Sequence, residues 1–231
     1  MIDIHTHCLP EMDDGAQNVN MSISMLQDSL SQGISVCVAT PHCILHDDNA
    51  IQRFIERRKK SFDKLTQYIK SKKIDVPKIL LGAEVYLDND INQYKDMDKL
   101  CIGNTDFILL EFPTDRQSKY IYDWIYNLTI SGFKPIIAHI DRYSHYDNII
   151  NELRGLDIIY QINASRILSF LGRKKVKKIM NYTNSVIIAS DMHNTTIRAC
   201  NIQKASKYIK NNLFISNNNT QNMLYNTFVN N

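Results

Sequence analysis

The sequence predicts an α/β fold in which strands and helices alternate and the parallel strands form a closed or nearly closed barrel. Seven short aliphatic or β-branched runs are each followed by polar or helical sequence. The runs are almost continuously apolar, as expected for strands that are buried on both faces. The segments between them are long enough for right-handed crossover helices. The runs are residues 2–7, 34–41, 78–86, 107–112, 135–140, 158–163 and 185–190.

Helical periodicity is clearest in the charged segment between the second and third runs. Apolar residues recur there at helical spacing, so one face is expected to be buried while the other carries arginines and lysines. These apolar residues are Ile51, Phe54, Ile55, Phe62, Leu65 and Ile69. Asn18 or Asn20 is a candidate cap for an earlier helix that stops at Gly33. A last helix, capped by the asparagine-rich residues 217–222, contains Met223, Leu224 and Phe228.

Length and composition favour a single globular domain that spans residues 1–231. An apolar fraction of 44% and a charged fraction of 22% are typical of a chain with a sizeable core. No apolar run approaches the roughly 20 residues that a membrane span needs. The chain begins with a strand-like run instead of a signal peptide, which favours a cytoplasmic protein without direct membrane insertion.

Cysteine usage agrees with a reducing compartment. The five cysteines are an odd number, and no two of them form a Cys-x-x-Cys pair. Cys8 follows the first histidines directly, and it is either buried filler or an oxidation-sensitive thiol.

Charge gives little indication of a polyanionic partner. The net charge is only +3. Basic residues cluster at 57–60 and 173–178, and both clusters are interpreted as the solvated sides of helices, with an anionic partner surface as the alternative. A nucleic-acid partner would favour a basic groove with aromatic stacking residues, and none is predicted.

Histidines and carboxylates lie at the ends of six of the seven apolar runs. Because the carboxyl ends of parallel strands converge at one mouth of a barrel, these side chains are expected to meet. His5 and His7 are two residues apart, so in a strand both imidazoles point to the same side. Imidazole and carboxylate are ligands for zinc, manganese and iron, and the pattern predicts a multinuclear metal site. The sixth run, which ends at Asn163, supplies no such ligand.

The motifs at these strand ends resemble those of a known superfamily. They are His-x-His at 5–7, Asp-Asp-Gly at 13–15, Thr-Pro-His at 40–42, Gly-x-Glu at 82–84, Leu-Glu-Phe at 110–112, Ala-His-x-x-Arg at 138–142 and Ser-Asp-x-His-Asn at 190–194. Together they resemble the polymerase and histidinol phosphatase (PHP) superfamily. Within it, the chain is similar to the manganese-dependent protein-tyrosine phosphatases of bacterial capsule and exopolysaccharide loci. The resemblance runs from Met1 to about Asn226 and implies a distorted seven-stranded (β/α) barrel of PHP type.

The resemblance also implies residue roles. Its metal ligands correspond to His5, His7, Asp14, His42, Glu84, Glu111, His139, Asp191 and His193. They would hold three divalent metal ions, with manganese as the expected metal and iron or zinc as alternatives. Glu84 would bridge two of the ions. Arg142 and Arg198 match the family arginines that bind the phosphoryl group, and they are the expected catalytic and substrate-binding residues. Asp141 stands where the family commonly has glutamate.

Physical chemistry supports the same activity. Metals about 3.5–4 Å apart hold a hydroxide that attacks a phosphoester in line, so the protein needs no side-chain nucleophile. Arginine suits the nonbridging oxygens because its planar fork donates two parallel hydrogen bonds. None of the five cysteines is followed by arginine at the sixth position, which excludes the Cys-x5-Arg mechanism. A Gly-x4-Gly-Lys-Ser/Thr phosphate loop is also missing.

The predicted function is hydrolysis of phosphotyrosine on a bacterial tyrosine autokinase, which regulates capsular or exopolysaccharide synthesis. A second interpretation keeps the metal site but takes a small phosphomonoester such as histidinol phosphate, or a nucleic-acid end. A third makes the chain a catalytically silent regulator that binds the kinase. An oligomer is compatible with each. His46 and His145 are expected at the surface or rim. Tyr86, Tyr143 and Tyr146 are candidates to line the substrate cleft, with core packing as the alternative for Tyr86.

Overall fold

The structure is a computed structural model that describes residues 1–114, 119–212 and 218–230. Its strands are β1 (Ile2–Thr6), β2 (Val36–Ala39), β3 (His42–Cys43), β4 (Lys78–Leu81), β5 (Glu84–Tyr86), β6 (Phe107–Glu111), β7 (Lys134–Ile137), β8 (Ile159–Asn163) and β9 (Val186–Ala189). Its α-helices are α1 (Val19–Ser31), α2 (Ala50–Lys72), α3 (Ile121–Ile130), α4 (Tyr146–Glu152), α5 (Ala164–Leu168), α6 (Phe170–Tyr182), α7 (Ile202–Asn212) and α8 (Asn218–Asn230). Short 3₁₀ turns cover Ile91–Gln93, Met97–Leu100 and Ile140–Arg142.

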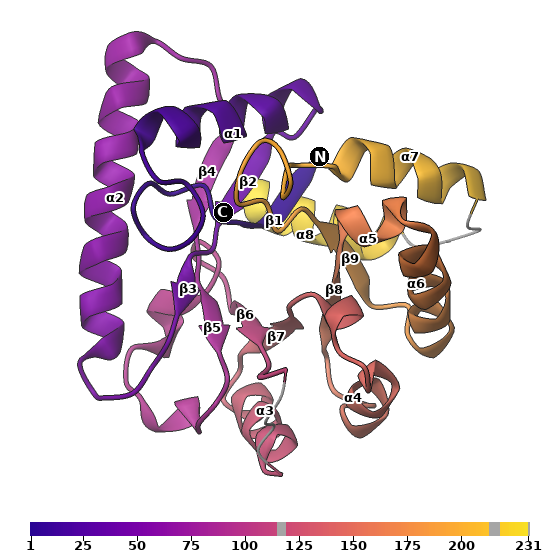
Figure 1. Cartoon of the computed structure of the whole chain (residues 1–231). Helices are drawn as coiled ribbons and strands as arrows, with labels where there is room; N and C mark the ends of the chain where they lie inside the picture. Colours follow the sequence, from indigo (N-terminus) through magenta and orange to yellow (C-terminus); the bar gives the residue numbers. More distant parts are fainter. Residues whose placement is uncertain (115–118, 213–217, 231) are drawn as a thin grey trace.

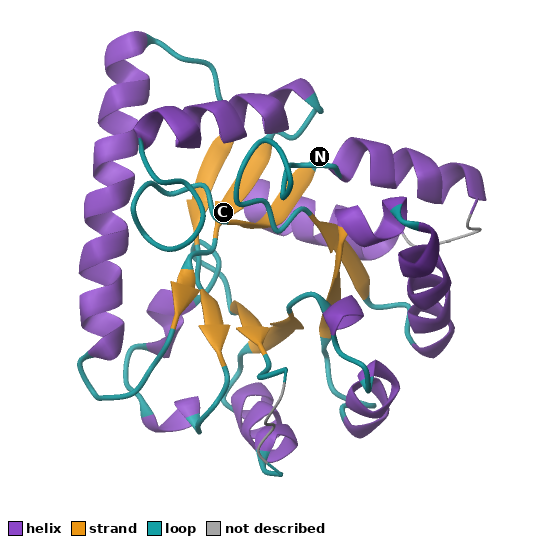
Figure 2. Ribbon diagram, viewed as in Figure 1, coloured by secondary structure: helices purple, strands orange, loops and turns teal. Residues whose placement is uncertain are grey.

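The predicted α/β fold with parallel strands is confirmed. Among the described residues, a three-stranded sheet has the order β1-β2-β4, and a six-stranded sheet has the order β3-β5-β6-β7-β8-β9. Every pairing within these sheets is parallel. Seen as in Figures 1 and 2, the strands surround the middle of the molecule and most helices lie outside them.

Two segments of the chain pass from one sheet to the other, and one of them is a predicted strand that is split in two. The run 34–41 becomes β2, and the chain then enters β3 at His42, just beyond the predicted end. Pro41 separates these strands because it has no N–H to donate to a ladder. The run 78–86 becomes β4 and β5 on either side of Gly82 and Ala83. Each segment therefore contributes to both sheets.

The ring of strands is distorted where its ends meet. An isolated parallel bridge joins Thr6 to Met192, beyond the end of β9. The His5 carbonyl accepts a hydrogen bond from the Asp191 backbone N–H at 2.9 Å, and the His7 N–H donates to the Met192 carbonyl at 2.9 Å. These contacts replace a regular ladder between β1 and β9, and they bring the first and last ligand-bearing segments side by side.

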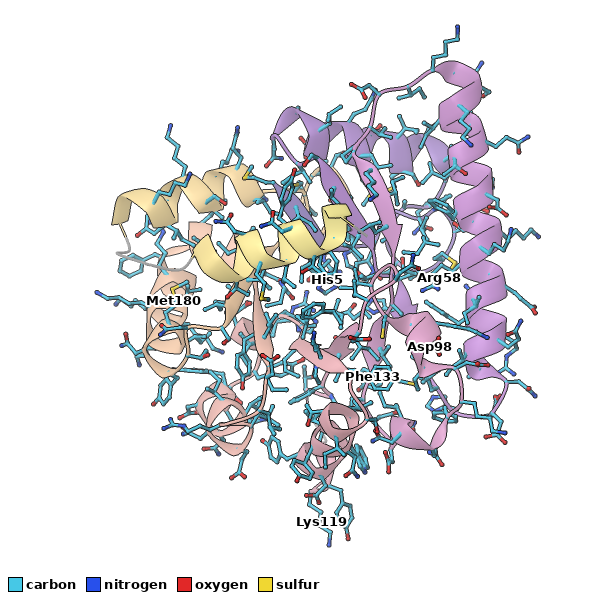
Figure 3. The ribbon with its side chains drawn as sticks, turned by 180° about the vertical axis from the view of Figure 1, so that it is seen from behind. His5, Arg58, Asp98, Lys119, Phe133 and Met180 are labelled. Carbon is cyan, nitrogen blue, oxygen red and sulfur yellow. The ribbon has the colours of Figure 1, made fainter. Side chains whose placement is uncertain are left out.

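An apolar cluster fills the barrel interior on the amino side of the strands. It includes Ile2, Ile4, Val36, Val38, Phe107, Leu109, Ile136, Ile159 and Ile187. Helix α8 belongs to the same cluster through Leu224 and Phe228, and the Phe228 ring meets Phe107 edge-on at 5.7 Å. Figure 3, seen from behind, has α8 in front of the strands. The predicted last helix thus closes this end of the barrel, while Asn217 and Asn231 lie outside the described residues.

Alternation along the strands changes the interior from apolar to polar. Phe107 and Leu109 of β6 share a side with Glu111, because every second residue of a strand points the same way. In β9, Ile187 and Ala189 belong to the same apolar cluster, and Asp191 follows two residues after Ala189. The carboxyl end of the barrel therefore receives the polar side chains.

Helices α1 and α2 agree with the sequence analysis in their main features. Asn18 caps α1, since its side chain accepts a hydrogen bond from the Met21 N–H, and Gly33 follows the helix with a φ of 79°. Among the predicted apolar positions of α2, Ile51, Phe54 and Leu65 are buried, and the others are partly buried against the same core. No helix within the described ranges is long and apolar enough to cross a membrane.

The interpretation of residues 57–60 as wholly solvated was wrong at Arg58. This guanidinium is buried and donates to the Gly82 carbonyl at 2.6 Å and to the Lys99 carbonyl at 2.8 Å. It also lies over the Phe54 ring. Arg58 therefore ties α2 to the β4–β5 break, a long-range contact that helical periodicity does not reveal.

Candidate metal centre

The carboxyl ends of the strands bring all nine predicted ligand residues into one connected cluster. β1 carries His5, and the loop after it carries His7 and Asp14. The remaining positions lie in β3, β5 and β6 and just after β7 and β9: His42, Glu84, Glu111, His139, Asp191 and His193. Three overlapping groups have ligand atoms close enough to share a cation: His7, Asp14, His42 and His193; His5, His7 and Glu84; and His42, Glu84 and Glu111.

Glu84 lies at the centre of the cluster. Its Oε2 is 3.2 Å from His5 Nε2 and 3.3 Å from His7 Nε2. The same oxygen is 2.9 Å from His42 Nδ1, and Oε1 is 2.9 Å from His139 Nε2. Two of the three groups include Glu84. A single carboxylate is therefore placed where it can contact two cations.

One group of ligand atoms reaches the solvent through Asp14. Asp14, which is 63% exposed, places Oδ1 3.2 Å from His193 Nε2 and 3.4 Å from His42 Nε2. The His193 ring stacks on His7 with centroids 3.8 Å apart. Glu111 lies on the other side of His42, with Oε2 3.9 Å from Nδ1, and its Oε1 is 3.3 Å from His139 Nε2. The cluster therefore runs from a buried floor to an open edge.

Unpartnered buried atoms indicate that these residues fit divalent cations. Glu84 Oε2 and His193 Nε2 are both buried, and among the described residues neither makes a hydrogen bond of regular geometry, although ring nitrogens lie 2.9–3.3 Å from the first atom and Asp14 Oδ1 lies 3.2 Å from the second. A buried polar atom without a partner costs free energy, whereas metal coordination would satisfy it. The donors are only imidazole nitrogens and carboxylate oxygens, which suit manganese, iron or zinc.

The charges of the cluster are strongly coupled. Burial lowers the pKa of His5, but the carboxylates of Glu84 and Asp191 outweigh burial and raise that pKa from 6.5 to about 9. Burial raises the pKa of Glu84, but the facing His5 and the hydrogen-bonded His139 outweigh it and hold that pKa well below its usual range. Positive charge next to Glu84 is therefore strongly favoured, as a cation site requires.

A strained backbone positions two of the ligands. His139 has a φ of 34° and Asp191 a φ of 53°, both in the left-handed region that non-glycine residues rarely adopt. The predicted strand 135–140 accordingly ends at Ile137, and a 3₁₀ turn follows His139. Backbone strain of this kind persists where surrounding contacts hold it, often at functional sites.

Asp13 orients His7, a role that the sequence analysis missed. Asp13 Oδ2 is 2.7 Å from His7 Nδ1 and accepts a hydrogen bond from the His42 backbone N–H at 3.0 Å. Burial raises the pKa of Asp13, but the hydrogen bond from His7 outweighs it and lowers that pKa to about 2. A carboxylate behind a ligating imidazole fixes its tautomer. The Asp-Asp-Gly motif is the sequence feature that could have revealed this role of Asp13.

Gly15 permits the turn that presents Asp13 and Asp14. A Cβ at Gly15 would lie 2.2 Å from the His7 carbonyl oxygen, so any larger residue would push this loop away from the site. The Gly15 N–H donates to Asp13 Oδ1 at 2.9 Å. Gln161 and Asn163 of β8 also reach the cluster, although no motif marks them.

Both predicted arginines lie at the exposed edge of the cluster and contact Asp191. Arg142 Nη2 donates to Asp191 Oδ2, and Arg198 Nη2 donates to Asp191 Oδ1 at 3.0 Å. Arg198 Nη1 is also 3.4 Å from Asp14 Oδ2. Each arginine side chain is 35% exposed, so both guanidinium groups can be reached from solvent.

Asp141, the neighbour of Arg142 in the 3₁₀ turn, is fully buried. Its buried carboxylate accepts a hydrogen bond from the Asn163 backbone N–H at 2.8 Å, and Oδ2 is 3.4 Å from Arg166 Nε. Burial raises the pKa of this carboxyl group.

The cysteines lie in the core. All five are free and buried. Burial raises the pKa of Cys8, Cys43, Cys101 and Cys200 to about 12 and that of Cys37 well above its usual value. A thiol must ionise to act as a nucleophile, so the structure agrees with the exclusion of cysteine chemistry.

The other predicted rim and cleft residues differ in their positions. His46 is exposed and His145 is partly buried. Tyr143 is a core residue, because it is buried and its hydroxyl accepts the Phe112 N–H at 2.9 Å. Tyr86 and Tyr146 are partly buried.

Known proteins resemble this chain over nearly its whole length. The family described as capsular polysaccharide synthesis, CpsB/CapC, matches residues 1–227. Tyrosine-protein phosphatase CpsB of Streptococcus agalactiae is 30% identical, with 99% of this chain and 100% of that protein covered. Tyrosine-protein phosphatase YwqE of Bacillus subtilis is 30% identical, with 89% of this chain and 82% of that protein covered. A solved structure, described as one of YwqE from Bacillus subtilis and CpsB from Streptococcus pneumoniae, "unique metal-dependent tyrosine phosphatases", matches with a TM-score of 0.76 at 26% identity, covering 92% of this chain and 87% of that chain.

Proposed function

Because the chain belongs to the capsular polysaccharide synthesis CpsB/CapC family, we propose that it is a metal-dependent phosphatase that hydrolyses phosphotyrosine on proteins. The observation that carries the proposal is the cluster itself: nitrogen and oxygen donors converge on Glu84, with two arginine forks at the open edge. The named relatives and the solved structure support the same activity. The silent-regulator alternative is disfavoured because every expected ligand position and both arginines are retained.

The nine cluster residues would hold three divalent cations, with manganese as the preferred metal. Bound cations would supply Lewis acidity, an activated water and charge neutralisation at the phosphoryl group. The groups around Glu84 would form the buried part of the site, and the group with Asp14 would lie nearest the substrate.

The two arginines would bind and orient the phosphoryl group. Arg142 and Arg198 donate planar pairs of N–H groups, which match two oxygens of a phosphate. As charge builds on those oxygens in the transition state, the fixed forks stabilise it more than they stabilise the substrate. The tyrosine oxygen has an intrinsic pKa near 10, so it leaves more easily than a serine alkoxide.

The proposed substrate is a phosphotyrosine-bearing bacterial autokinase that controls polysaccharide synthesis. The family's description supports a role in capsule formation, and the named relatives support a phosphorylated protein as the substrate. We place the enzyme in the cytoplasm, since five free buried thiols suit a reducing compartment, and we treat residues 1–231 as one catalytic domain.

Substrate competition tests the proposal. Purified protein is stripped with a chelator, reloaded with Mn²⁺, and assayed with a phosphotyrosine peptide, a phosphoserine peptide and histidinol phosphate. We expect the highest kcat/KM with phosphotyrosine and a loss of activity by orders of magnitude in Glu84→Gln. Preference for histidinol phosphate would replace the protein substrate with a small phosphomonoester. Full activity after exhaustive chelation would refute the metal requirement.

A further inference from the structure

The strand without a predicted ligand carries two buried amide side chains next to the ligands. Gln161 and Asn163 of β8 are two residues apart, so both point to the same side of the strand. We propose that Gln161, assisted by Asn163, is a positioning residue that holds His5, His139 and Asp191 in their metal-binding geometry. The inference rests on the metal-dependent function proposed above.

Hydrogen bonding determines which way the Gln161 amide faces. Its Oε1 lies 2.6 Å from the backbone nitrogen of His139. A backbone N–H can only donate, so the atom facing it is the amide oxygen. The opposite end, Nε2, then donates to Asn163 Oδ1 at 2.7 Å. Exchanging the oxygen and nitrogen would place two donors against each other, so the orientation is unambiguous.

The Gln161 oxygen also selects the tautomer of His5. It lies 3.1 Å from His5 Nδ1, and because an amide oxygen only accepts, Nδ1 must carry a proton. The neutral imidazole then has its lone pair on Nε2, the atom that lies 3.2 Å from Glu84 Oε2. One amide oxygen thus presents the His5 ring to the cluster and also holds the backbone of His139, whose φ is 34°.

Asn163 extends the same network to Asp191. Its Nδ2 donates to Asp191 Oδ2 at 2.9 Å. This contact leaves Asp191 Oδ1 on the side of His5 Nε2, at 3.6 Å. Asp191 also has a left-handed φ of 53°, a backbone conformation that persists only where surrounding contacts hold it. The two amides therefore connect ligands at the carboxyl ends of three different strands, β1, β7 and β9.

Interior packing alone does not explain why β8 carries amide side chains at these two positions. A buried amide is costly unless its donors and acceptors are paired, and an apolar residue of similar size would fill the same space. If Gln161 and Asn163 only filled the interior, replacement would change folding stability without a selective effect on metal affinity. A positioning role instead predicts that metal affinity changes, and that the change depends on which hydrogen bonds the new side chain can still make.

Four variants separate these roles. Gln161→Met keeps the length of the side chain and removes both hydrogen-bonding functions, whereas Gln161→Glu keeps an acceptor for His5 and His139. Asn163→Leu removes the contact with Asp191. Ile162→Val, on the opposite side of β8 and also buried, is the control. Mn²⁺ affinity is measured without substrate, by the electron paramagnetic resonance signal of free Mn²⁺, and thermal unfolding is recorded for each metal-free variant.

We expect Gln161→Met to weaken Mn²⁺ binding by about 10- to 100-fold, the usual effect of removing a partner behind a metal ligand. Gln161→Glu should retain more affinity than Gln161→Met, Asn163→Leu should also bind more weakly than the unaltered protein, and Ile162→Val should leave affinity unchanged. Unchanged affinity in Gln161→Met, or equal losses in Met and Glu variants of equal stability, would overturn the inference. If the unaltered protein bound no divalent cation, the proposed metal-dependent function itself would be refuted, whatever the variants showed.

A measurement on the unaltered protein keeps the test valid if Gln161→Met does not fold. In the zinc-loaded protein, long-range proton–nitrogen NMR correlations report which ring nitrogen of each histidine carries a proton. We expect a slowly exchanging proton on His5 Nδ1. Absence of a proton from His5 Nδ1 would contradict the selection of its tautomer by Gln161.

Discussion

Arg198 and Arg142 approach one carboxylate, Asp191, from the exposed edge, but neither has a ligand atom that a cation would use. Arg198→Ala should therefore keep its bound metal and lose about 10² to 10³ in kcat, the usual effect of removing a charge-stabilising donor. Arg198→Lys should rescue poorly, since an ammonium cannot reproduce the planar fork. Steady-state kinetics and metal analysis of the same samples test this prediction.

Arg154→Ala is a matched control for Arg198. Arg154 is exposed, and within the part of the chain that the structure describes its guanidinium bonds only to Asn151. Its removal should change neither metal content nor turnover. Alanine at both Arg142 and Arg198 with unchanged catalytic efficiency would remove their proposed role at the phosphoryl group.

The cysteines provide a second prediction at the residue scale. Cys43→Ser and Cys101→Ser should remain active when folded and metal-loaded, because burial raises the pKa of both thiols to about 12. The native enzyme should also resist alkylation at pH 8, where too little thiolate is present. Single-turnover hydrolysis in water enriched in heavy oxygen should label phosphate and leave the protein unlabelled. A trapped phosphocysteine would contradict this mechanism.

At the scale of the element, α8 closes the amino end of the barrel, far along the strands from the ligands. Phe228 is fully buried against Phe107. Phe228→Ala should lower the free energy of unfolding by about 3–5 kcal/mol, the usual cost of emptying such a site. Metal affinity at low temperature should be nearly unchanged, because the ligands are carried at the opposite strand ends. Urea unfolding and Mn²⁺ titration measure the two effects separately.

Met223→Ala is the control for α8, since Met223 lies on the same helix and is 47% exposed. It should change the free energy of unfolding by less than about 0.5 kcal/mol. Equal losses in the two variants would mean that burial of Phe228 adds no stability beyond that of an exposed residue on the same helix.

At the scale of the whole molecule, stability depends on how the cluster's negative charge is balanced. In the metal-free protein, burial lowers the pKa values of His5 and His42, but the nearby Glu84 carboxylate outweighs burial. Both pKa values therefore rise from 6.5 to about 9. Their folded pKa values exceed the unfolded ones, so this stabilisation is complete below pH 6.5 and is lost as the pH rises to about 9. The Tm of the metal-free protein should fall over this window.

Divalent metal should reverse this dependence. Coordinated imidazoles must lose their protons, so cation affinity should rise with pH over the same range. Excess Mn²⁺ should then raise Tm by mass action, with a larger increase at pH 8.5 than at pH 6.5. Calorimetric scans with and without Mn²⁺ test this prediction. A pH-independent Tm in the metal-free protein would contradict the protonated state of His5 and His42.

Sequence by itself determined the order of the strands along the chain and the fold class, and its motifs carried the resemblance that implied the nine candidate ligands. Strand runs such as 107–112 are recognisable because their apolar pattern is local, and chemically distinctive residues such as Glu111 stand at their ends. His-x-His and Asp-Asp-Gly are short motifs in which neighbouring residues act together. Such local patterns can be recognised directly in the amino-acid sequence.

Tertiary structure alone decided the contacts that connect distant segments. Gln161 reaches His5 and His139 across the barrel, Arg58 pairs with carbonyls of the β4–β5 break and of a later turn, and Pro41 moves one segment between sheets. Glutamine, arginine and proline are common at many unremarkable positions, so their identity does not mark these roles. Only the closure of the strands brings their partners within hydrogen-bonding distance, and that closure depends on packing between residues far apart in the chain.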